Sequence, residues 1–333
     1  MTDRKTLATA FINTTDWANG TRVDLAGDAS NRRYERVFAP ITELPAVLMD
    51  SPPGQAEDAA TFVFITNHLR DLGLSAPEIL AEDTEHGFLL IEDLGDDLYA
   101  RILRSDPSLE IPLYKAATDV LVKLHSEPMP KLETMGPRVM AHLDDIAFTH
   151  YSGGILGAHD TDLAARFVDR FEEILRTTVQ GDPVLVQRDY HAENLLWLPD
   201  RGGVARVGLL DYQAALAGHR AYDLVSLLQD ARRDVPADIE SQMIDHYIAN
   251  TNVDSQGFRT AYTVLGVQRN LRILGVFARL SSDYGKPQYV DLIPRVWAHM
   301  IRGLDHPALA PVADIIRNSM PQPTPENLDK LRP

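Results

Sequence analysis

Three oxygen-bearing side chains, spaced closely along the chain, carry most of the chemical information in this sequence. Asp189 follows the apolar run 184–186, Asn194 comes five residues later, and Asp211 stands behind two further apolar segments. Phosphoryl transfer from a nucleotide needs a carboxylate that orients a hydroxyl and accepts its proton. It also needs an amide oxygen and a second carboxylate that bind Mg²⁺. The spacing therefore predicts Asp189 as the catalytic residue and Asn194 and Asp211 as metal ligands.

Each of these residues alone has an ordinary structural explanation. Asp189 and Asn194 are common turn residues, and Asp211 is a common residue at the start of a helix. The joint arrangement favours the catalytic interpretation, because the β-hairpin expected from 195–198 and 205–210 returns the chain to the same edge. The hairpin would bring the two magnesium ligands together.

Three neighbouring polar residues are expected to support the catalytic loop. Gln187 and His191 flank Asp189, and Asp223 opens a helix expected at 222–231. We expect His191 to hydrogen-bond to the loop backbone in preference to the substrate. Asp223 is expected either to cap its helix at the positive end of the helix dipole or to hydrogen-bond to the catalytic loop.

Two stretches of different pattern must position these residues. The first, residues 1–92, is rich in strands, whereas the chain from residue 96 onward is mostly helical. Helices are expected at 3–18, 56–71, 111–126, 161–177, 222–231, 236–250, 257–282 and 288–303, and strands at 33–38, 46–49, 88–91 and 184–186. The tail after Pro321 is expected to wrap loosely or to fray. The sequence thus predicts an α+β fold, with a sheet lobe at 1–92, a hinge at 93–95 and a helical lobe at 96–333.

Polar residues before the first predicted strand are candidates for nucleotide binding. Ser30, Asn31, Arg32 and Arg33 offer hydroxyl, amide and guanidinium groups to phosphate oxygens. Because neighbouring residues in a strand point to opposite faces, only one of the two arginines is expected to bind. The chain has no glycine-rich loop ending in Lys and Ser or Thr, so this is not a Walker-type site.

The hinge is the second candidate for nucleotide binding. Ligands usually bind in clefts between domains, so the predicted hinge and the residue before it are expected to contact the nucleotide. These residues are Glu92, Asp93 and Leu94.

The composition excludes several other classes of protein. The net charge is −16, with 48 acidic and 32 basic side chains, which argues against nucleic acid as a partner. The absence of cysteine excludes disulfides, thiolate zinc sites and cysteine nucleophiles. The N-terminus lacks the apolar core of a signal peptide, and no apolar run approaches the roughly 18 residues of a membrane span. A cytoplasmic protein without a membrane partner is expected.

Over roughly residues 5–300 the chain resembles the aminoglycoside phosphotransferase (APH)/choline kinase branch of the kinase-like superfamily. The resemblance rests on Asp189, Asn194 and Asp211, on the hinge after Ile91, and on the helical second half. It implies a two-lobed protein-kinase-like fold, with a small antiparallel-sheet N-lobe and a large helical C-lobe, that uses ATP and Mg²⁺.

Three further segments are similar to the anomeric sugar kinases of bacterial cell-wall recycling. They span residues 27–34, 48–53 and 223–233. That group phosphorylates the C1 hydroxyl of N-acetylmuramic acid and N-acetylglucosamine with ATP. The resemblance therefore implies a small sugar as the substrate.

Two positions depart from the usual kinase pattern. Gln187 stands where the catalytic loop usually begins with His, and the strand 46–50 lacks the usual Lys for the α- and β-phosphates. The sugar kinases share the Met49-Asp50 pattern, so this absence does not by itself imply inactivity.

Two alternatives stay open beside the sugar kinase. The first is a kinase of another small hydroxyl compound, such as an aminoglycoside, because the acidic net charge suits a cationic substrate. The missing Lys suits a nucleotide-binding pseudokinase, although the intact catalytic motif opposes that interpretation. No set of sugar-contacting residues is predicted. His142, His150, Tyr151 and Arg232 are candidates without further support.

Overall fold

A computed structural model of the protein describes residues 3–25, 32–39, 44–54 and 58–333. The chain divides into two compact units, and each unit is made of two segments. The first, here called the sheet unit, comprises residues 1–127 and 192–215, and the second, the helical unit, comprises residues 128–191 and 216–333. The hinge expected at 93–95 stays a prediction.

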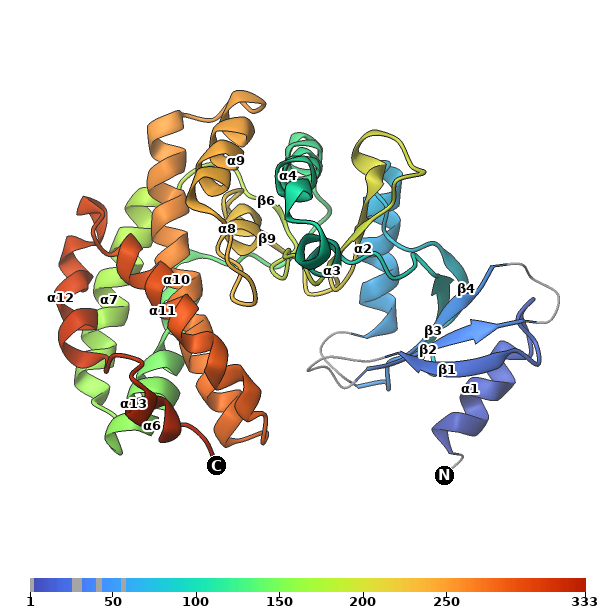
Figure 1. The fold of residues 1–333 in the computed structure, drawn as a ribbon, viewed down its shortest axis with the longest axis horizontal. Helices are drawn as coiled ribbons and strands as arrows, with labels where there is room; N and C mark the ends of the chain where they lie inside the picture. Colours follow the sequence, from blue (N-terminus) through green and yellow to red (C-terminus); the bar gives the residue numbers. More distant parts are fainter. Residues whose placement is uncertain (1–2, 26–31, 40–43, 55–57) are drawn as a thin grey trace. The chain divides into compact units, whose positions relative to one another are not determined.

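An antiparallel sheet forms the first part of the sheet unit (Figure 1). Its described strands, in spatial order, are β1 (Thr21–Leu25), β2 (Arg33–Phe38), β3 (Ala46–Asp50), β5 (Phe88–Glu92) and β4 (Ile79–Asp83). The central strands β3 and β5 are apolar and buried, which made them visible in the sequence. The outer strands β1 and β4 mix charged with apolar residues and were not predicted.

Helix α1 (Arg4–Ile12) covers one face of this sheet and closes a small core. The core contains Phe11, Leu48 and Phe88, and the rings of Phe11 and Phe88 stack at 5.9 Å. The helix is shorter than the expected 3–18, because the hydroxyl of Thr14 donates to the backbone oxygen of Phe11 just past the helix end.

Other helices and a hairpin complete the sheet unit. Helix α2 (Ala59–Asp71) begins at Asp58, whose carboxylate accepts a 2.8 Å hydrogen bond from the backbone of Thr61. The remaining elements are α3 (Tyr99–Ser105), α4 (Glu110–Ser126), β7 (Leu195–Trp197) and β8 (Val207–Leu209). Helix α4 packs against β8 and against the 3₁₀ turn Gly203–Arg206, which directly precedes β8. The hairpin expected from the sequence is confirmed.

The helical unit is built around one long central helix, α10 (Ser255–Ser282). It packs against neighbours on several sides, so it has no wide polar face. The other elements are α5 (Pro137–Leu143), the π-helix Ala147–Ser152, α6 (Gly153–Leu156), α7 (Thr161–Thr178), β6 (Val184–Val186), β9 (Leu216–Gly218), α8 (Tyr222–Leu228), α9 (Ala237–Ala249), the 3₁₀ helix Pro287–Leu292, α11 (Ile293–Gly303), the 3₁₀ turn Pro307–Leu309, α12 (Ala310–Ser319) and α13 (Pro325–Asp329).

The C-terminal tail packs onto the helical unit, so of the two expected outcomes, loose wrapping or fraying, the second is wrong. Leu331 is buried, and Arg332 donates to the backbone oxygen of Pro287 at 3.1 Å and to Asp291 at 2.7 Å. The sequence concealed this because an isolated leucine among polar residues has no periodicity.

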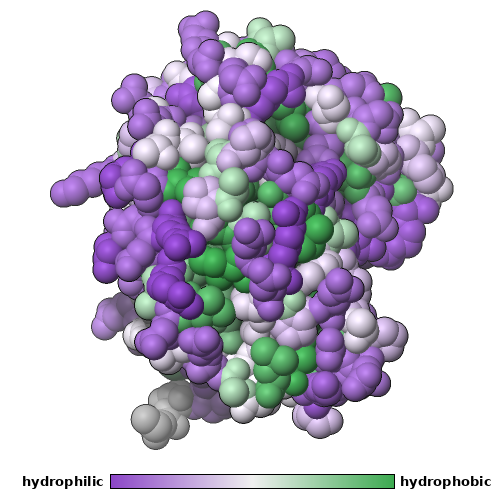
Figure 2. Space-filling model, turned by 90° about the vertical axis from the view of Figure 1, so that its left-hand side faces the viewer, coloured by the Kyte–Doolittle hydropathy of each residue, from purple (hydrophilic) through white to green (hydrophobic). Residues whose placement is uncertain are grey.

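Seen from the side of α7 and α12, the helical unit is mostly covered by hydrophilic side chains (Figure 2). None of the described helices is long and apolar enough to cross a membrane.

Candidate active site

The catalytic loop of the helical unit is held by one buried carboxylate. Strand β6 ends at Val186, and the backbone N–H groups of Gln187 and Arg188 then donate to the two oxygens of Asp223 at 2.7 and 2.8 Å. Asp223 lies in the first turn of α8 and is fully buried. Both of its oxygens are therefore used to fix the backbone immediately before Asp189.

Burial also changes the acidity of this carboxylate. Loss of water raises the pKa of Asp223 to about 7, although the two backbone donors and Arg269 favour the charged form. The partly exposed Asp189 contributes to the rise as a second negative charge. The loop is thus fixed by a group that changes charge near neutral pH.

The backbone is strained at two positions of the motif. Arg188 has φ +76° and Asp211 has φ +56°, a left-handed conformation that residues other than glycine adopt infrequently. Such strain is retained where the surrounding structure determines it, and it clusters at functional sites. Here it immediately precedes Asp189 and coincides with Asp211.

His191 lies in the helical unit beside two arginines. Burial, then the charges of Arg232 and Arg269, hold the pKa of His191 well below its ordinary value. The ring is therefore neutral, and its Nε2 lies 3.2 Å from Nη1 of Arg232. Because a guanidinium only donates, Nε2 is the acceptor in this contact. The hydrogen bond from His191 to the loop backbone that the sequence led us to expect stays a prediction, and the contact with Arg232 was not predicted.

The two predicted metal ligands lie side by side in the sheet unit. Leu195 pairs with Leu209 in the hairpin, and the backbone N–H of Leu210 donates to the backbone oxygen of Asn194 at 3.0 Å. Asp211 follows directly, and its Oδ1 accepts a 2.7 Å hydrogen bond from Gln213. One amide oxygen and one carboxylate are a donor set that fits Mg²⁺, which takes few protein ligands beside phosphates and water.

Tyr212 anchors the residue next to Asp211. Its hydroxyl lies 2.6 Å from the hydroxyl of Thr66, and its ring stacks on Phe62 with centroids 5.3 Å apart. Both partners belong to α2. Burial raises the pKa of the Tyr212 hydroxyl, so the group stays protonated and can donate. No local pattern in the sequence indicates this pairing between distant residues.

The candidate phosphate-binding arginines differ in burial. Arg32 is buried, whereas Arg33 is exposed and pairs in register with Asp50 at the end of β3. Ser30 and Asn31 lie outside the described residues.

Strand β3, which lacks the usual lysine, ends in a buried methionine and a paired aspartate. Met49 is fully buried, and Asp50 is bound by Arg4 of α1, whose Nε donates at 3.1 Å. Arg4 also lies over the ring of Phe88, 4.2 Å from its centroid. The end of β3 is therefore tied to α1 by an ion pair.

Charged residues of the predicted hinge bind arginines of their own unit. Nε of Arg36, on β2, lies 2.5 Å from Asp93, and its Nη1 donates to Asp96 at 3.1 Å. These two carboxylates raise the pKa of the Arg36 guanidinium. Glu92 forms an ion pair with Arg201. The side chains of Glu92 and Asp93 are thus engaged.

Leu94 and the other candidate residues have different surroundings. A side-chain atom added to Gly208 of β8 would lie 3.2 Å from Leu94, so the two residues are close neighbours. In the helical unit the hydroxyl of Tyr151 donates to the backbone oxygen of Pro321 at 2.6 Å, which gives this tyrosine a structural contact. His142 contacts the backbone oxygen of Arg138 in its own helix, and His150 lies 4.0 Å from Asp283.

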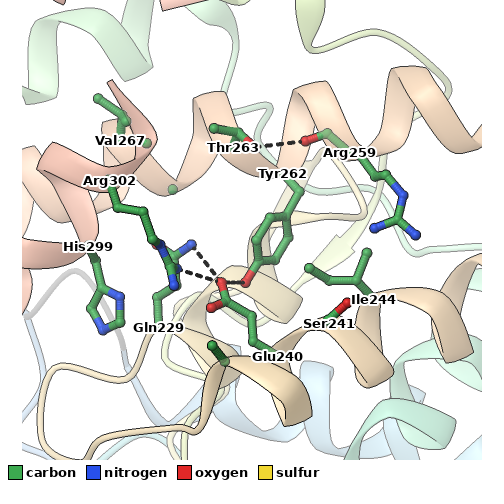
Figure 3. Close-up of a pocket in the computed structure, with 13 residues that line it drawn as sticks. Gln229, Glu240, Ser241, Ile244, Arg259, Tyr262, Thr263, Val267, His299 and Arg302 are labelled. Atoms are coloured by element: carbon green, nitrogen blue, oxygen red, sulfur yellow. Dashed lines mark hydrogen bonds and ion pairs between the residues drawn. The ribbon is translucent and has the colours of Figure 1, made fainter. Parts of the chain in front are cut away.

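A polar pocket of about 310 Å³ lies among α9, α10 and α11 of the helical unit (Figure 3). Its wall contains Glu240, whose Oε1 accepts hydrogen bonds from Gln229 at 3.2 Å, from Tyr262 at 2.8 Å and from Arg302 at 2.8 Å. The side-chain amide of Asn270 donates to Oε1 of Gln229 at 2.7 Å. This network holds Gln229, the residue directly after α8.

Comparison with known proteins identifies the family of the chain. The family model for the phosphotransferase enzyme family, APH, matches residues 21–257. An N-acetylmuramate/N-acetylglucosamine kinase of Caulobacter vibrioides is 37% identical, with 92% of this chain and 94% of the relative covered. A protein of the same name from Pseudomonas putida is 32% identical, with 89% and 88% covered.

Solved structures show the same fold at low identity. A choline/ethanolamine kinase family protein from Mesorhizobium loti has a TM-score of 0.65 at 14% identity, over 95% of this chain and 100% of the other. The ADP-bound aminoglycoside phosphotransferase APH(2'')-Ib has a TM-score of 0.60 at 13% identity, over 93% and 98%. The fold is thus that of the kinase-like phosphotransferases. Together with the match to the phosphotransferase enzyme family, it implies the use of ATP. The chain belongs to the phosphotransferase enzyme family.

Proposed function

We propose that this protein transfers the γ-phosphoryl group of ATP to the C1 hydroxyl of N-acetylmuramate and N-acetylglucosamine. The observation that carries the substrate class is the 37% identity, over 92% of the chain, to a kinase named for these two sugars. A role in recycling cell-wall sugars in the cytoplasm, where ATP is available, follows from this activity. The acidic net charge of −16 supports small molecules, not nucleic acids, as partners.

Asp189 is the proposed catalytic residue. Its carboxylate orients the C1 hydroxyl and accepts the proton as the new oxygen–phosphorus bond forms. The bond from the γ-phosphorus to the bridging oxygen breaks, and ADP leaves with that electron pair. Positioning dominates such a reaction, so the two hydrogen bonds from Gln187 and Arg188 to Asp223 have a direct purpose. They fix the backbone that carries Asp189.

Asn194 and Asp211 are the proposed ligands of Mg²⁺. When bound, Mg²⁺ would neutralise charge on the phosphates of ATP. Arg32, or Arg33, is the proposed replacement for the missing strand lysine, and the burial of Arg32 favours it as the one ordered by the fold. Because the side chains of Glu92 and Asp93 bind arginines, we propose that the hinge contacts the nucleotide through its backbone and Leu94.

The test is turnover of ATP with a panel of acceptors. We expect ADP release with N-acetylmuramate and N-acetylglucosamine but not with an aminoglycoside such as kanamycin. Phosphorus NMR of the product should show a phosphate on C1. Asp189→Asn should lower kcat at least about 100-fold while the KM for ATP changes little, because the loop is retained.

A matched control and clear failures complete this test. Asp200→Asn removes an equal charge from an exposed turn and should leave kcat within about twofold. Absence of ADP release above background with every sugar would refute the enzyme assignment and favour a nucleotide-binding pseudokinase. A phosphate on another hydroxyl would refute C1 as the acceptor, and turnover of kanamycin would refute the substrate class.

A further inference from the structure

Two arginines of the helical unit lie close to the catalytic loop and have no part in the proposed phosphoryl transfer. Arg232 contacts His191, which is two residues after Asp189, at 3.2 Å. Arg269 is 6% exposed and donates through Nη2 to the hydroxyl of Ser226 at 2.7 Å. Both positive charges act on His191. Asp189, Asn194 and Asp211 account for proton transfer and metal binding without them.

Arg269 retains a buried donor that the fold does not use. Within the described part of the chain, its Nη1 has no hydrogen-bond partner. A buried cationic N–H without an acceptor is costly, so its retention needs a reason. Because Arg269 is close enough to act on both His191 and Asp223, this donor is in the neighbourhood of the catalytic loop. An anionic ligand bound there would supply the missing acceptor.

The loop that carries Arg232 is fixed from several helices. Gln229, where the loop begins, is held in the wall of the pocket by Glu240 (Figure 3). Asn270 also donates to the side-chain oxygen of Gln229 at 2.7 Å. Further along, Arg295 of α11 donates to the backbone oxygen of Ala231 at 2.9 Å. The backbone of Arg232 itself donates to Asp230 at 2.8 Å. Such a preorganised cation binds an anion with less loss of conformational entropy.

Neutral His191 suits this arrangement. If the ring were protonated, it would repel Arg232 and could not accept its hydrogen bond. Burial keeps the ring neutral, so His191 can direct one edge of the guanidinium. A guanidinium has donors on more than one edge and binds a carboxylate by two parallel hydrogen bonds. His191 is therefore a positioning residue for Arg232.

We propose that Arg232, assisted by Arg269, binds the carboxylate of an acidic acceptor sugar and sets the preference between acidic and neutral substrates. The inference rests on the proposed function and deepens it. N-acetylmuramate carries a lactyl carboxylate, whereas N-acetylglucosamine has a hydroxyl at the same position. One enzyme that accepts both must meet that charge with a group that the neutral sugar does not require.

The test compares the two sugars in wild type and variants. Arg232→Gln should lower kcat/KM for N-acetylmuramate at least about 30-fold, mainly through KM. The loss for N-acetylglucosamine should be at least tenfold smaller. Arg232→Lys keeps the charge without the planar fork and should recover part of the loss. Arg233→Gln removes the same charge one residue away, and it should leave the ratio of the two kcat/KM values within about threefold of wild type.

His191 has its own test. His191→Leu removes the acceptor for Arg232 and should shift the sugar ratio in the same direction as Arg232→Gln. His191→Gln retains an acceptor oxygen and should restore most of the ratio. If the role of His191 were merely structural, His191→Leu would lower kcat/KM equally for both sugars and would lower the thermal midpoint. His191→Gln would then not restore the ratio of the two kcat/KM values, although it retains an acceptor oxygen.

The outcomes separate this inference from the proposed function. Equal losses for both sugars in Arg232→Gln and Arg232→Lys, with wild type active on both, would overturn the carboxylate site and leave the kinase intact. Wild type that accepts only the neutral sugar would also overturn it. Wild type inactive on both sugars would overturn the proposed function and the inference together.

Discussion

At the scale of single residues, Tyr212 links a predicted metal ligand to a helix. Asp211 holds an unfavourable left-handed backbone, and the next residue is fixed on α2 by a ring stack and a hydrogen bond. Thr66 is fully buried, so its hydroxyl depends on the short hydrogen bond with the hydroxyl of Tyr212. The position of Asp211 is therefore coupled to the position of α2 through one hydroxyl pair.

Removing either hydroxyl should cost stability in a coupled way. We expect Tyr212→Phe and Thr66→Val each to lower the free energy of unfolding by about 1–2 kcal/mol, because each leaves a buried hydroxyl without its partner. The double variant should lose about 1 kcal/mol less than the sum of the two single losses. Urea unfolding measures all three. Tyr284→Phe, at an exposed tyrosine, is the control. Strictly additive losses would show that the pair is not coupled.

Residue types in a short stretch were predictable, but their partners were not. Asp189, Asn194 and Asp211 stand out because one local spacing serves a known chemistry. Thr66 and Tyr212 are 146 residues apart, and no local pattern pairs them. Arg269 did leave a signal, since it interrupts the apolar run of a buried helix. That signal shows that a cation is buried, without indicating what it faces.

At the scale of elements, the start of α8 and the end of β6 act together through Asp223. The carboxylate accepts hydrogen bonds from two backbone N–H groups of the catalytic loop. A carboxylate at the start of a helix ordinarily accepts hydrogen bonds from the backbone of that same helix. Protonation would remove one of the two acceptor oxygens. The order of the loop is therefore linked to pH in the range where Asp223 titrates.

The free energy of unfolding should depend on the protonation of Asp223. The pKa of Asp223 is about 7 in the fold against an ordinary value of 3.8, so the folded protein binds more protons between these values. The resulting stabilisation is fully present below about pH 3.8 and is lost as the pH rises to about 7. Between about pH 5 and pH 8, the unfolding free energy of wild type should fall by about 2 kcal/mol more than that of Asp223→Asn.

Urea unfolding of both proteins at the two pH values measures this difference, and other titrating groups cancel in the comparison. Parallel pH dependences would show that Asp223 does not titrate in this range. Catalysis offers an independent check, since kcat of wild type should rise with pH through about 7 as the second acceptor oxygen becomes available.

Elements were predictable where burial produced a clear pattern. The strand β3 has four buried apolar residues in sequence, and α7 keeps its apolar residues on one face. β1 and β4 are edge strands in which exposed apolar and charged residues are mixed, so their pairing depends on neighbours that local patterns do not reveal. Helix α12 was missed for a related reason, because proline and scattered apolar residues resembled a loop.

At the scale of the whole molecule, the chain crosses between its two units three times. Each unit is assembled from two separate segments, and residues 192–215 complete the sheet unit. Within that unit the segment 192–215 supplies Tyr212 to α2, and the backbone oxygen of Ala205 accepts a 2.6 Å hydrogen bond from the hydroxyl of Ser75. Neither unit is therefore a continuous stretch that sequence composition could delimit.

This interleaving predicts how fragments of the chain should behave. Residues 1–127 alone would expose the faces of α2 and α4 that the hairpin covers, and should therefore unfold without a cooperative transition and bind a hydrophobic dye. Joining residues 192–215 to this fragment through a flexible linker of about 20 residues should restore cooperative urea unfolding, followed by circular dichroism. Tyr212→Phe in the joined fragment should lower the urea midpoint of that fragment. If residues 1–127 alone unfold with the same midpoint as the joined fragment, the hairpin is not part of the cooperative unit.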